Sequence, residues 1–257
     1  MAMNICVCIK QVPDIQAPFR IVDGRLQFDV ERYVLNAYDA SAVEGALQLV
    51  EQHGGTVEVV TIGPASVSET IRKALAMGAE RAYHIEAEPS GWDSATVATV
   101  LAAFFRDRSY DAIFTGKQAQ DTDAGLTGTM LAERLGLPYV SNAVGLAYED
   151  GHLIVTRQGD AGREIIELTL PGLVTISNDM NDPRIPSIRG IMQARRKPVE
   201  QLTLSDLGLS DDALRPQTRV TGYRPVPPRA PGRKLEGEPA EVVRELVRLL
   251  REEARVL

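Results

Sequence analysis

A run of small and polar residues carries the clearest indication of chemistry. It spans residues 116–128, follows the apolar residues 112–115, and leads into a helical pattern formed by Leu126, Met130, Leu131 and Leu135. The start of a helix presents unpaired N–H groups and a partial positive charge. Gly125 lets an anion approach that backbone closely, and the Thr127 hydroxyl adds a donor. The pattern therefore predicts a strand, a loop and a helix that bind a nucleotide phosphate.

A purely structural interpretation of the same run stays open. It contains neither the Gly-Lys-Ser/Thr triplet of a P-loop nor the Gly-x-Gly-x-x-Gly fingerprint of a dinucleotide site. In this interpretation the loop is an ordinary connection in which Asp123 caps a helix over residues 123–135. Because two carboxylates would repel a phosphate, we expect Asp121 and Asp123 to cap the helix or orient the loop.

Composition narrows the class of protein. The 257 residues are 44% hydrophobic and 25% charged, which predicts a packed core in one large domain or in one domain with an appendage. The net charge of −7 argues against nucleic acid as a partner. No apolar stretch approaches the roughly 20 residues of a membrane span, so we expect no membrane insertion. The chain enters a strand without a signal pattern, which predicts a cytoplasmic protein, or a mitochondrial-matrix protein in a eukaryote.

The sequence offers no catalytic constellation. Cys6 and Cys8 lie two apart in an apolar strand, so we expect buried thiols on one face and no disulfide between them. The three histidines, His53, His84 and His152, are scattered without a serine or cysteine partner. Neither a metal-binding motif nor a catalytic triad is present. We therefore expect a binding or carrier protein without its own catalytic residues and without a metal site.

Strand and helix patterns alternate along the first 140 residues. Strands are predicted at residues 4–9, 57–62, 82–85 and 112–115, and helices at 37–52, 66–77, 94–106 and 123–135. Such alternation predicts an α/β fold, with a parallel sheet covered by helices on both faces. Ligands of these sheets bind beyond the carboxyl ends of the strands, where the strand order reverses. The candidate loops are residues 9–13, 62–66 and 116–123.

Two hairpins and an arm complete the expected organisation. One hairpin is predicted over residues 19–34 around Asp23-Gly24, and the other pairs residues 153–157 with 164–169. A further strand, 173–176, follows Pro171. Four prolines within residues 225–231 predict an extended linker before an amphipathic helix in the last 20 residues. We expect a domain over residues 1–222 and an arm over 223–257 that packs on a partner or another subunit.

Five segments in order carry a resemblance to a known family. They are Cys8-Ile9-Lys10-Gln11-Val12; Asn36-Ala37-Tyr38-Asp39; Gly63-Pro64-Ala65 with residues 69–79; residues 116–128; and the second hairpin through Leu170-Pro171 to Asn181-Asp182-Pro183-Arg184 and residues 191–194. Along nearly its whole length the chain resembles the β subunit of electron transfer flavoprotein. The resemblance implies an adenine-nucleotide-α-hydrolase-like fold, a heterodimer with an α subunit that holds most of the FAD, and AMP as a structural ligand.

The resemblance also implies which residues contact AMP. Transferred position by position, the contacts fall on Cys8, Asn36, Ala37, Tyr38, Asp39, Ile62, Gly116, Lys117, Gln118, Ala119, Gln120, Asp121, Thr122, Asp123, Ala124, Gly125, Leu126 and Thr127. Main-chain groups would provide most of the binding. The backbone of residues 116–127 and the Thr127 hydroxyl would hold the phosphate, and Asp39 would accept from the ribose or the adenine.

Two positions are expected to face the flavin. The family places aromatic side chains at the positions of Ile15 and Tyr38. Tyr38 fits this pattern, whereas Ile15 replaces the tyrosine of some members. An aliphatic side chain can still exclude water from the isoalloxazine. The structural alternative for Tyr38 is a core aromatic at the start of a helix.

A second surface implied by the resemblance docks partner dehydrogenases. Residues 178–197 correspond to the family's recognition loop, with Ile185, Ile188 and Met192 as docking residues and Ile188 as the anchor. Burial under the chain's own arm is the alternative for this apolar series. The basic run Arg195-Arg196-Lys197 either steers acidic partners or is a solvated charge run.

The implied activity is electron transfer. A β subunit of this kind would help shuttle electrons from acyl-CoA and other dehydrogenases to a quinone-linked oxidoreductase. One alternative is a bifurcating subunit with FAD in place of AMP, although those relatives carry Val-Gly-Pro where this chain has Leu126-Thr127-Gly128-Thr129. Another is an ATP pyrophosphatase, which would need a Ser-Gly-Gly-x-Asp-Ser loop. The chain has residues 10–14, Lys-Gln-Val-Pro-Asp, at that place.

Overall fold

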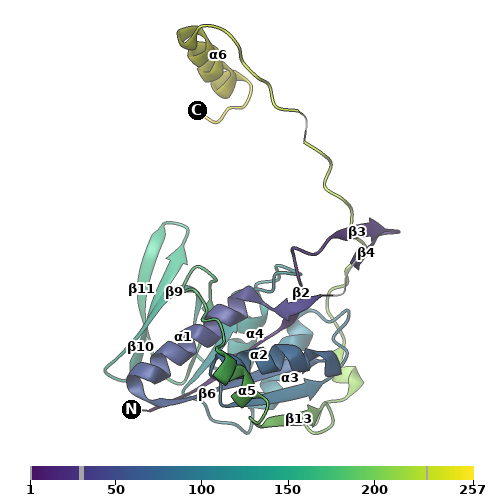
Figure 1. Cartoon of the computed structure of the whole chain (residues 1–257), viewed down its shortest axis with the longest axis vertical. Coiled ribbons are helices and arrows are strands. Elements are labelled where there is room, and N and C mark those ends of the chain that lie inside the picture. The colour runs from purple at the N-terminus through teal and green to yellow at the C-terminus, as the bar shows by residue number, and fades with distance from the viewer. Residues whose placement is uncertain (1, 29–31, 230) are drawn as a thin grey trace. The chain divides into compact units, whose positions relative to one another are not determined.

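A computed structural model describes residues 2–28, 32–229 and 231–257 and divides the chain into two compact units, Met1–Gly222 and Tyr223–Leu257. The first unit is built on one large sheet (Figure 1). Its strands are β1 Met3–Cys8, β6 Gly55–Gly63, β7 Arg81–Glu86, β8 Ala112–Gly116, β9 Tyr139–Glu149, β10 His152–Gly159, β11 Gly162–Leu168, β12 Gly172–Ile176 and β13 Val199–Thr203. They lie in the order β11-β10-β9-β12-β8-β1-β6-β7-β13. All neighbours from β9 to β13 in this order are parallel, whereas β10 and β11 add an antiparallel hairpin.

Helices cover both faces of the sheet, as the alternation of patterns predicted. Helices α1 Ala37–His53, α2 Ser68–Met77 and α5 Ile188–Ala194 contribute to one buried cluster, and α3 Ser94–Phe105 and α4 Thr127–Leu135 to the other. Side chains of β1 alternate between the clusters: Ile5 and Val7 face α1, whereas Cys6 and Cys8 face α3 and α4. Both cysteines are free and buried, as expected.

The strand order reverses at β1. From β1 the chain crosses to β6 and β7 on one side, and later returns to β8 and β12 on the other. The carboxyl ends of β1 and β8 therefore lead into separate connections, residues 9–10 and 117–126; the predicted loop 9–13 is in part a short strand, residues 11–13. A crevice between such loops is where open α/β sheets bind ligands.

Both predicted hairpins are present, but the first is shorter than the predicted 19–34: it ends at Phe28, residues 29–31 lie outside the described residues, and Tyr33–Leu35 pairs with another strand. Strands β3 Phe19–Val22 and β4 Arg25–Phe28 are joined by Asp23 and Gly24, whose φ angles of 50° and 73° are those of a turn suited to a two-residue hairpin. A short pair, β2 Gln11–Pro13 with β5 Tyr33–Leu35, closes the connection to α1. The second hairpin is β10 with β11.

One predicted boundary is wrong in a way that affects the site. The helix expected from residue 123 begins at Thr127, because Asp123 has a φ of 50° and cannot continue a right-handed helix. Leu126 is the residue before the helix, so Asp123 is not its cap.

The helix expected from residue 66 begins at Ser68, after the 3₁₀ turn η1 Ala65–Val67. A second 3₁₀ turn, η2 Asp211–Leu214, follows β13.

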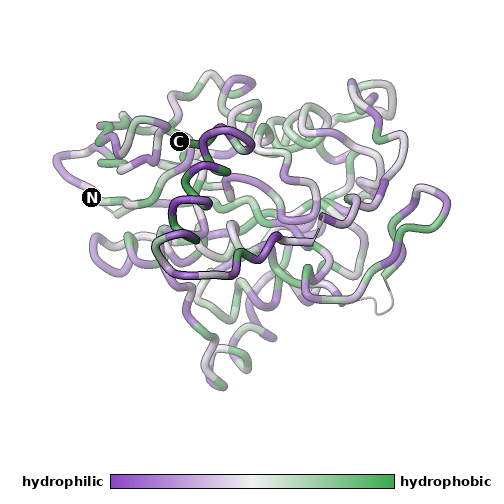
Figure 2. Tube along the Cα trace, turned by 90° about the horizontal axis from the view of Figure 1, so that it is seen from above, coloured by the Kyte–Doolittle hydropathy of each residue, from purple (hydrophilic) through white to green (hydrophobic). Residues whose placement is uncertain are grey.

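The second unit contains helix α6 Pro239–Glu252. Arg248 pairs with Glu245 and Glu252 on its polar face, and Val243 and Leu246 are exposed. Hydrophilic and hydrophobic segments alternate along this helix beside the C-terminal label in Figure 2. Within the described ranges, no helix has the length and apolar character needed to cross a bilayer. The same ranges contain no group of three or more side chains placed to hold a metal ion.

Candidate functional site

Asp39 ties together the two strand ends that meet at the reversal. It lies in the first turn of α1 and is buried. Its Oδ2 accepts the Lys10 N–H at 2.7 Å, and its Oδ1 accepts the Gly116 N–H at 3.0 Å. Burial raises the pKa of Asp39 to about 7, although hydrogen bonds from Lys10, Asn36 and Gly116 act in the opposite direction. One carboxyl group thus fixes the ends of β1 and β8 relative to α1.

The close approach of the end of β8 to the start of α1 requires a glycine at position 116. A Cβ at Gly116 would overlap Asp39 Oδ1 and lie 2.7 Å from Tyr38 Cβ. Only glycine lets the end of β8 approach the start of α1 so closely. Tyr38 is half-buried at this contact.

Asn36 holds the loop after β8 against the start of α1. Its Nδ2 donates to Gln118 O at 2.8 Å, and its Oδ1 accepts the Gln120 N–H at 3.2 Å. Gln120 Oε1 in turn accepts the Ala37 N–H at 3.2 Å. The structure therefore brings residues 36–39 and the first part of the 116–127 segment together, although about 80 residues of chain separate them.

Both loop carboxylates are occupied by neighbouring side chains. Lys10 Nζ lies 2.8 Å from each carboxylate oxygen of Asp121. Asp123 Oδ1 accepts from Gln118 Nε2 at 2.8 Å. These contacts orient the loop, which was one of the two arrangements expected for these acids. The Lys10 ammonium also offsets the charge of Asp121, whereas Gln118 is neutral and leaves the charge of Asp123 in place.

The start of α4 is open to a ligand. No side chain in the part of the chain that the structure describes caps this helix, whose first residue, Thr127, is half-buried. Gly128 brings the helix close to the sheet, because a Cβ there would lie 2.5 Å from Thr115 Oγ1 and 2.7 Å from Thr175 Cγ2. The first-turn N–H groups of α4 thus lie above the ends of β8 and β12. This arrangement suits an anion.

Cys8 and Ile62, two further residues predicted to contact AMP, lie in a different place from Ile15, which is predicted to face the flavin. Cys8 and Ile62 belong to, or pack against, the cluster under α3 and α4, so they lie on the α4 face of the strand ends. Burial and then the charge of Asp39 raise the pKa of the Cys8 thiol, which keeps it protonated. Ile15 lies apart from this cluster, in the connection after β2, and is 61% exposed.

The predicted docking residues form an exposed apolar surface. Ile185, Ile188 and Met192 are 92%, 80% and 65% exposed, respectively. Helix α5 packs on α2 through the buried Ala194 and through Gly190, where a Cβ would lie 2.6 Å from Ala76 O. We call Ile185, Ile188 and Met192 the apolar docking surface.

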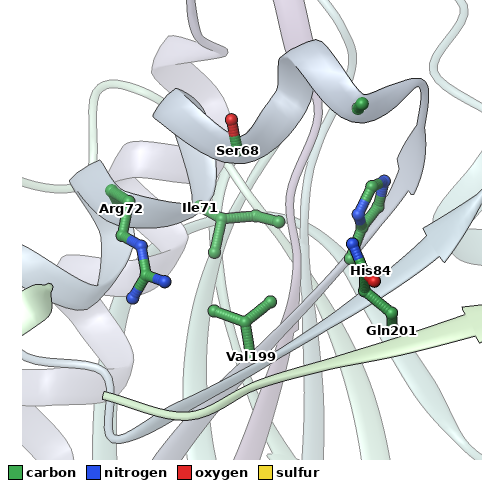
Figure 3. A pocket seen from close by; sticks show the side chains of 7 residues that line it. Ser68, Ile71, Arg72, His84, Val199 and Gln201 are labelled. Carbon is green, nitrogen blue, oxygen red and sulfur yellow. The ribbon is translucent and has the colours of Figure 1, made fainter. Parts of the chain in front are cut away.

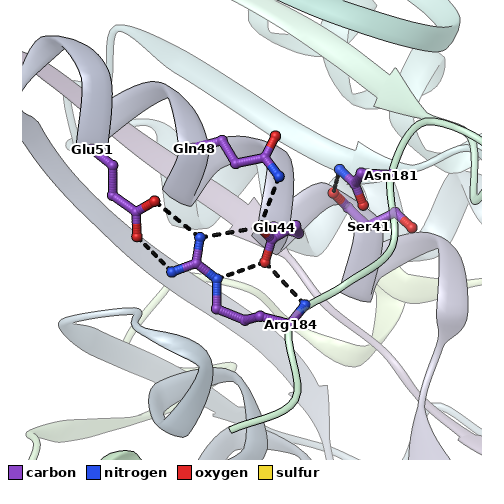
Figure 4. A network of polar contacts seen from close by, with 6 residues as sticks. All are labelled: Ser41, Glu44, Gln48, Glu51, Asn181 and Arg184. Carbon is purple, nitrogen blue, oxygen red and sulfur yellow. Dashed lines mark hydrogen bonds and ion pairs between the residues drawn. The ribbon is translucent and has the colours of Figure 1, made fainter.

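An ion-pair network anchors the segment that precedes this surface, and no motif in the sequence predicts it directly. Arg184 Nε donates to Glu44 Oε2 at 2.7 Å and Nη2 to Glu44 Oε1 at 3.0 Å, and the guanidinium also pairs with Glu51 (Figure 4). Asn181 Nδ2 donates to Ser41 O at 3.0 Å. Burial alone would raise the pKa of Glu44, but hydrogen bonds from Arg184 and Gln48 hold it below its usual value. The only available signal was a pair of glutamates two turns apart on one helix face.

Lys197 has a role that neither sequence interpretation of the basic run anticipated. Its Nζ donates to Leu75 O, Gly78 O and Ala79 O at 2.9, 3.3 and 2.6 Å. These carbonyls lie at the C-terminal end of α2, where a cation complements the helix dipole. Lys197 therefore neither steers partners nor remains solvated, whereas Arg195 and Arg196 are exposed.

Comparisons with known proteins agree with this architecture. The family described as electron transfer flavoprotein domain matches residues 26–207. The electron transfer flavoprotein subunit beta of Bacillus subtilis is 37% identical over 257 residues, which are 99% of this chain and 100% of the relative. The corresponding subunit of Mycobacterium bovis is 34% identical over 91% of this chain and 93% of its own length. Subunit CarD of the caffeyl-CoA reductase–Etf complex of Acetobacterium woodii is 38% identical over 82% of each chain. The chain therefore belongs to the electron transfer flavoprotein β-subunit family.

Proposed function

We propose that this chain is the β subunit of a heterodimeric, cytoplasmic electron transfer flavoprotein. In this proposal it binds AMP as a structural ligand and completes an FAD site held mostly by an α subunit. The bound flavin accepts electrons from acyl-CoA and other dehydrogenases and passes them to a quinone-linked oxidoreductase. The chain itself contributes binding, positioning and exclusion of water.

The loop region at the ends of β1 and β8 carries the nucleotide part of the proposal. It combines the uncapped start of α4 with a loop whose two carboxylates are already bonded to Lys10 and Gln118. The uncapped helix start and the pairing of Lys10 with Asp121 favour a phosphate. On the flavin side, the half-buried Tyr38 and the exposed Ile15 are the side chains that we assign to the isoalloxazine.

Nucleotide content tests this assignment directly. The chain would be produced together with its α subunit, the complex denatured, and the released nucleotides quantified by chromatography. AMP and FAD in equal amounts would support the proposal. Twice as much FAD as protein complex, without AMP, would replace it with the bifurcating alternative. Release of pyrophosphate from ATP by the purified chain would instead indicate a pyrophosphatase.

Replacing Thr127 with valine should weaken AMP retention by about tenfold or more, because a hydrogen bond to a charged group contributes roughly 1.5 to 3 kcal/mol. Equilibrium dialysis of the complex against labelled AMP measures the effect. Thr129→Val is the matched control, since its hydroxyl donates to Leu126 O within the chain. Equal AMP affinity in the Thr127 and Thr129 variants would exclude the Thr127 hydroxyl from the phosphate site.

The apolar docking surface is proposed to enter a pocket of partner dehydrogenases. Ile188→Ala should lower the second-order rate constant of flavin reduction by such a dehydrogenase roughly ten- to thirtyfold, as loss of a buried anchor costs about 2 kcal/mol. The flavin spectrum should not change. Ile165→Ala is a matched control, because Ile165 is 76% exposed on β11. An Ile188 variant as fast as the Ile165 variant would refute the anchor role.

The arm, residues 223–257, is proposed to pack on the α subunit. Its helix α6 has no buried residue, although Val243 and Leu246 are apolar. Deleting residues 225–257 should therefore prevent co-purification with the α subunit. Size-exclusion chromatography checks this, and a normal heterodimer formed by the shortened chain would show that the arm is not needed for assembly.

A further inference from the structure

A cavity lies away from the proposed nucleotide site. It has a volume of about 270 Å³ and lies between α2 and strands β7 and β13. Its lining residues are Ala65, Ser68, Ile71, Arg72, His84, Val199 and Gln201 (Figure 3). None of these seven residues belongs to the proposed AMP or flavin contacts. The cavity is smaller than the roughly 300 to 1,000 Å³ typical of drug-sized ligands, so it suits a smaller molecule.

The polar groups of the cavity are separated by an apolar middle. Figure 3 shows Arg72 on one side of Ile71 and Val199, and His84 with Gln201 on the other. The pairing of β7 with β13 explains why His84 and Gln201 lie together, since these two residues are direct neighbours across the strands. Val199 is paired with Ala82, two residues earlier on each strand. A molecule that fills the cavity therefore meets a cation at one end, aliphatic side chains in the middle and an imidazole at the other end.

His84 presents an unused nitrogen at its end of the cavity. The residue is 3% exposed, and its Nε2 lies 2.8 Å from Gly63 O, so Nε2–H must donate to this carbonyl. In the neutral imidazole, Nδ1 is then an acceptor. Among residues 2–28, 32–229 and 231–257, none bonds to Nδ1. Because His84 lines the cavity, its Nδ1 can accept a hydrogen bond from a donor on a bound molecule.

Arg72 supplies the complementary charge. Its Nη1 donates to Ala194 O at 2.5 Å and to Lys197 O at 3.1 Å, which leaves the donors on Nε and Nη2. None of the seven lining residues is acidic, and within the described chain Arg72 forms no ion pair. A guanidinium without a carboxylate partner is a strong site for a carboxylate.

We propose that this cavity binds a small organic acid. The carboxylate of the acid pairs with Arg72, its short aliphatic chain contacts Ile71 and Val199, and its hydroxyl or amino group donates to His84 Nδ1. The side-chain amide of Gln201, which lies beside His84 (Figure 3), supplies an additional hydrogen bond. This binding site is independent of the proposed electron-transfer function.

Nuclear magnetic resonance of the full-length chain with isotope-labelled histidine tests the proposal. The probes are glycolate, γ-hydroxybutyrate and ε-hydroxyhexanoate, compared at equal ionic strength with butyrate, butanol and inorganic phosphate. At least one hydroxy acid should shift the His84 resonances in a saturable manner and leave His53 and His152 unchanged. Butyrate lacks the donor and butanol lacks the carboxylate, so both should bind more weakly by at least about tenfold.

Two variants test whether the acid binds in the cavity itself. Arg72→Gln should weaken binding by at least about tenfold, whereas Arg106→Gln, at an exposed arginine, should not change it. Because Arg72 also bonds to the end of α5, Val199→Phe provides a second test: it fills the middle of the cavity and leaves the Arg72 contacts in place. The proposal is overturned if no hydroxy acid shifts His84, if Val199→Phe binds normally, or if phosphate produces the same response.

Discussion

Replacing Arg184 with methionine is expected to lower the free energy of unfolding by about 2 to 3 kcal/mol. The side chain of Glu44 is 5% exposed and that of Arg184 is 32% exposed, so the substitution leaves a buried carboxylate without its cation. Removing one partner of a buried pair costs more than removing both. Urea denaturation measures the loss, and Arg189→Met, at an exposed arginine beside the docking surface, serves as the control.

The double variant Arg184→Met with Glu44→Gln should recover most of this stability.

The stabilisation by this network should weaken at low pH, since the pKa of Glu44 is depressed in the folded protein. The contribution is therefore fully present above the unfolded pKa of about 4.5 and is lost as the pH falls through the lower, folded value. If wild type and the Arg184 variant unfold at the same urea concentration near neutral pH, the network does not stabilise the fold.

Asp39→Asn is expected to weaken the proposed binding of AMP and to change how stability depends on pH. Asparagine has only one oxygen, so the N–H of Lys10 or of Gly116 would face an amide donor instead of an acceptor. The ends of β1 and β8 would then separate, and AMP affinity should fall by about tenfold. Equilibrium dialysis of the complex measures this loss.

The pH effect follows from the raised pKa. Between pH 3.8, the ordinary pKa of an aspartate, and about 7, the folded protein holds a proton on Asp39 that the unfolded chain has lost. The unfolding free energy of the wild type should therefore fall as the pH rises through this window, by as much as about 4 kcal/mol. Asp39→Asn should lack this part of the slope, and Asp107→Asn, at an exposed position, should retain it. Identical slopes in the wild type and the Asp39 variant would contradict the raised pKa.

The layered architecture could be predicted because its cause is local. The buried strands are short apolar runs, and the helices between them repeat apolar residues at helical spacing. Strands β9 and β13 were not predicted. β13 has only two apolar residues in five, Val199 and Leu202, and β9 is interrupted by Asn142 with a φ of 60°. Pairing with β7 and β12 stabilises these strands, and tertiary pairing leaves no periodic signal in the sequence.

The site could be predicted only to the level of its loops. Three predicted loops follow strand ends, and two of them meet at the reversal beside β1. The residues that join them act over long separations, such as the 77 positions between Asp39 and Gly116 and the 140 between Glu44 and Arg184. Spacing also could not show the left-handed backbone of Asp123, which delays the start of α4.

The segment that carries the apolar docking surface is fastened at both ends. Arg184 holds its beginning to α1, and Arg72 and Lys197 join its end to α2. A recognition element that is already ordered loses little conformational entropy when a partner arrives. More of the binding free energy is then available to slow dissociation of the complex. In the proposed electron transfer, in which the protein must leave each partner in turn, a docking surface of only three side chains keeps each contact small.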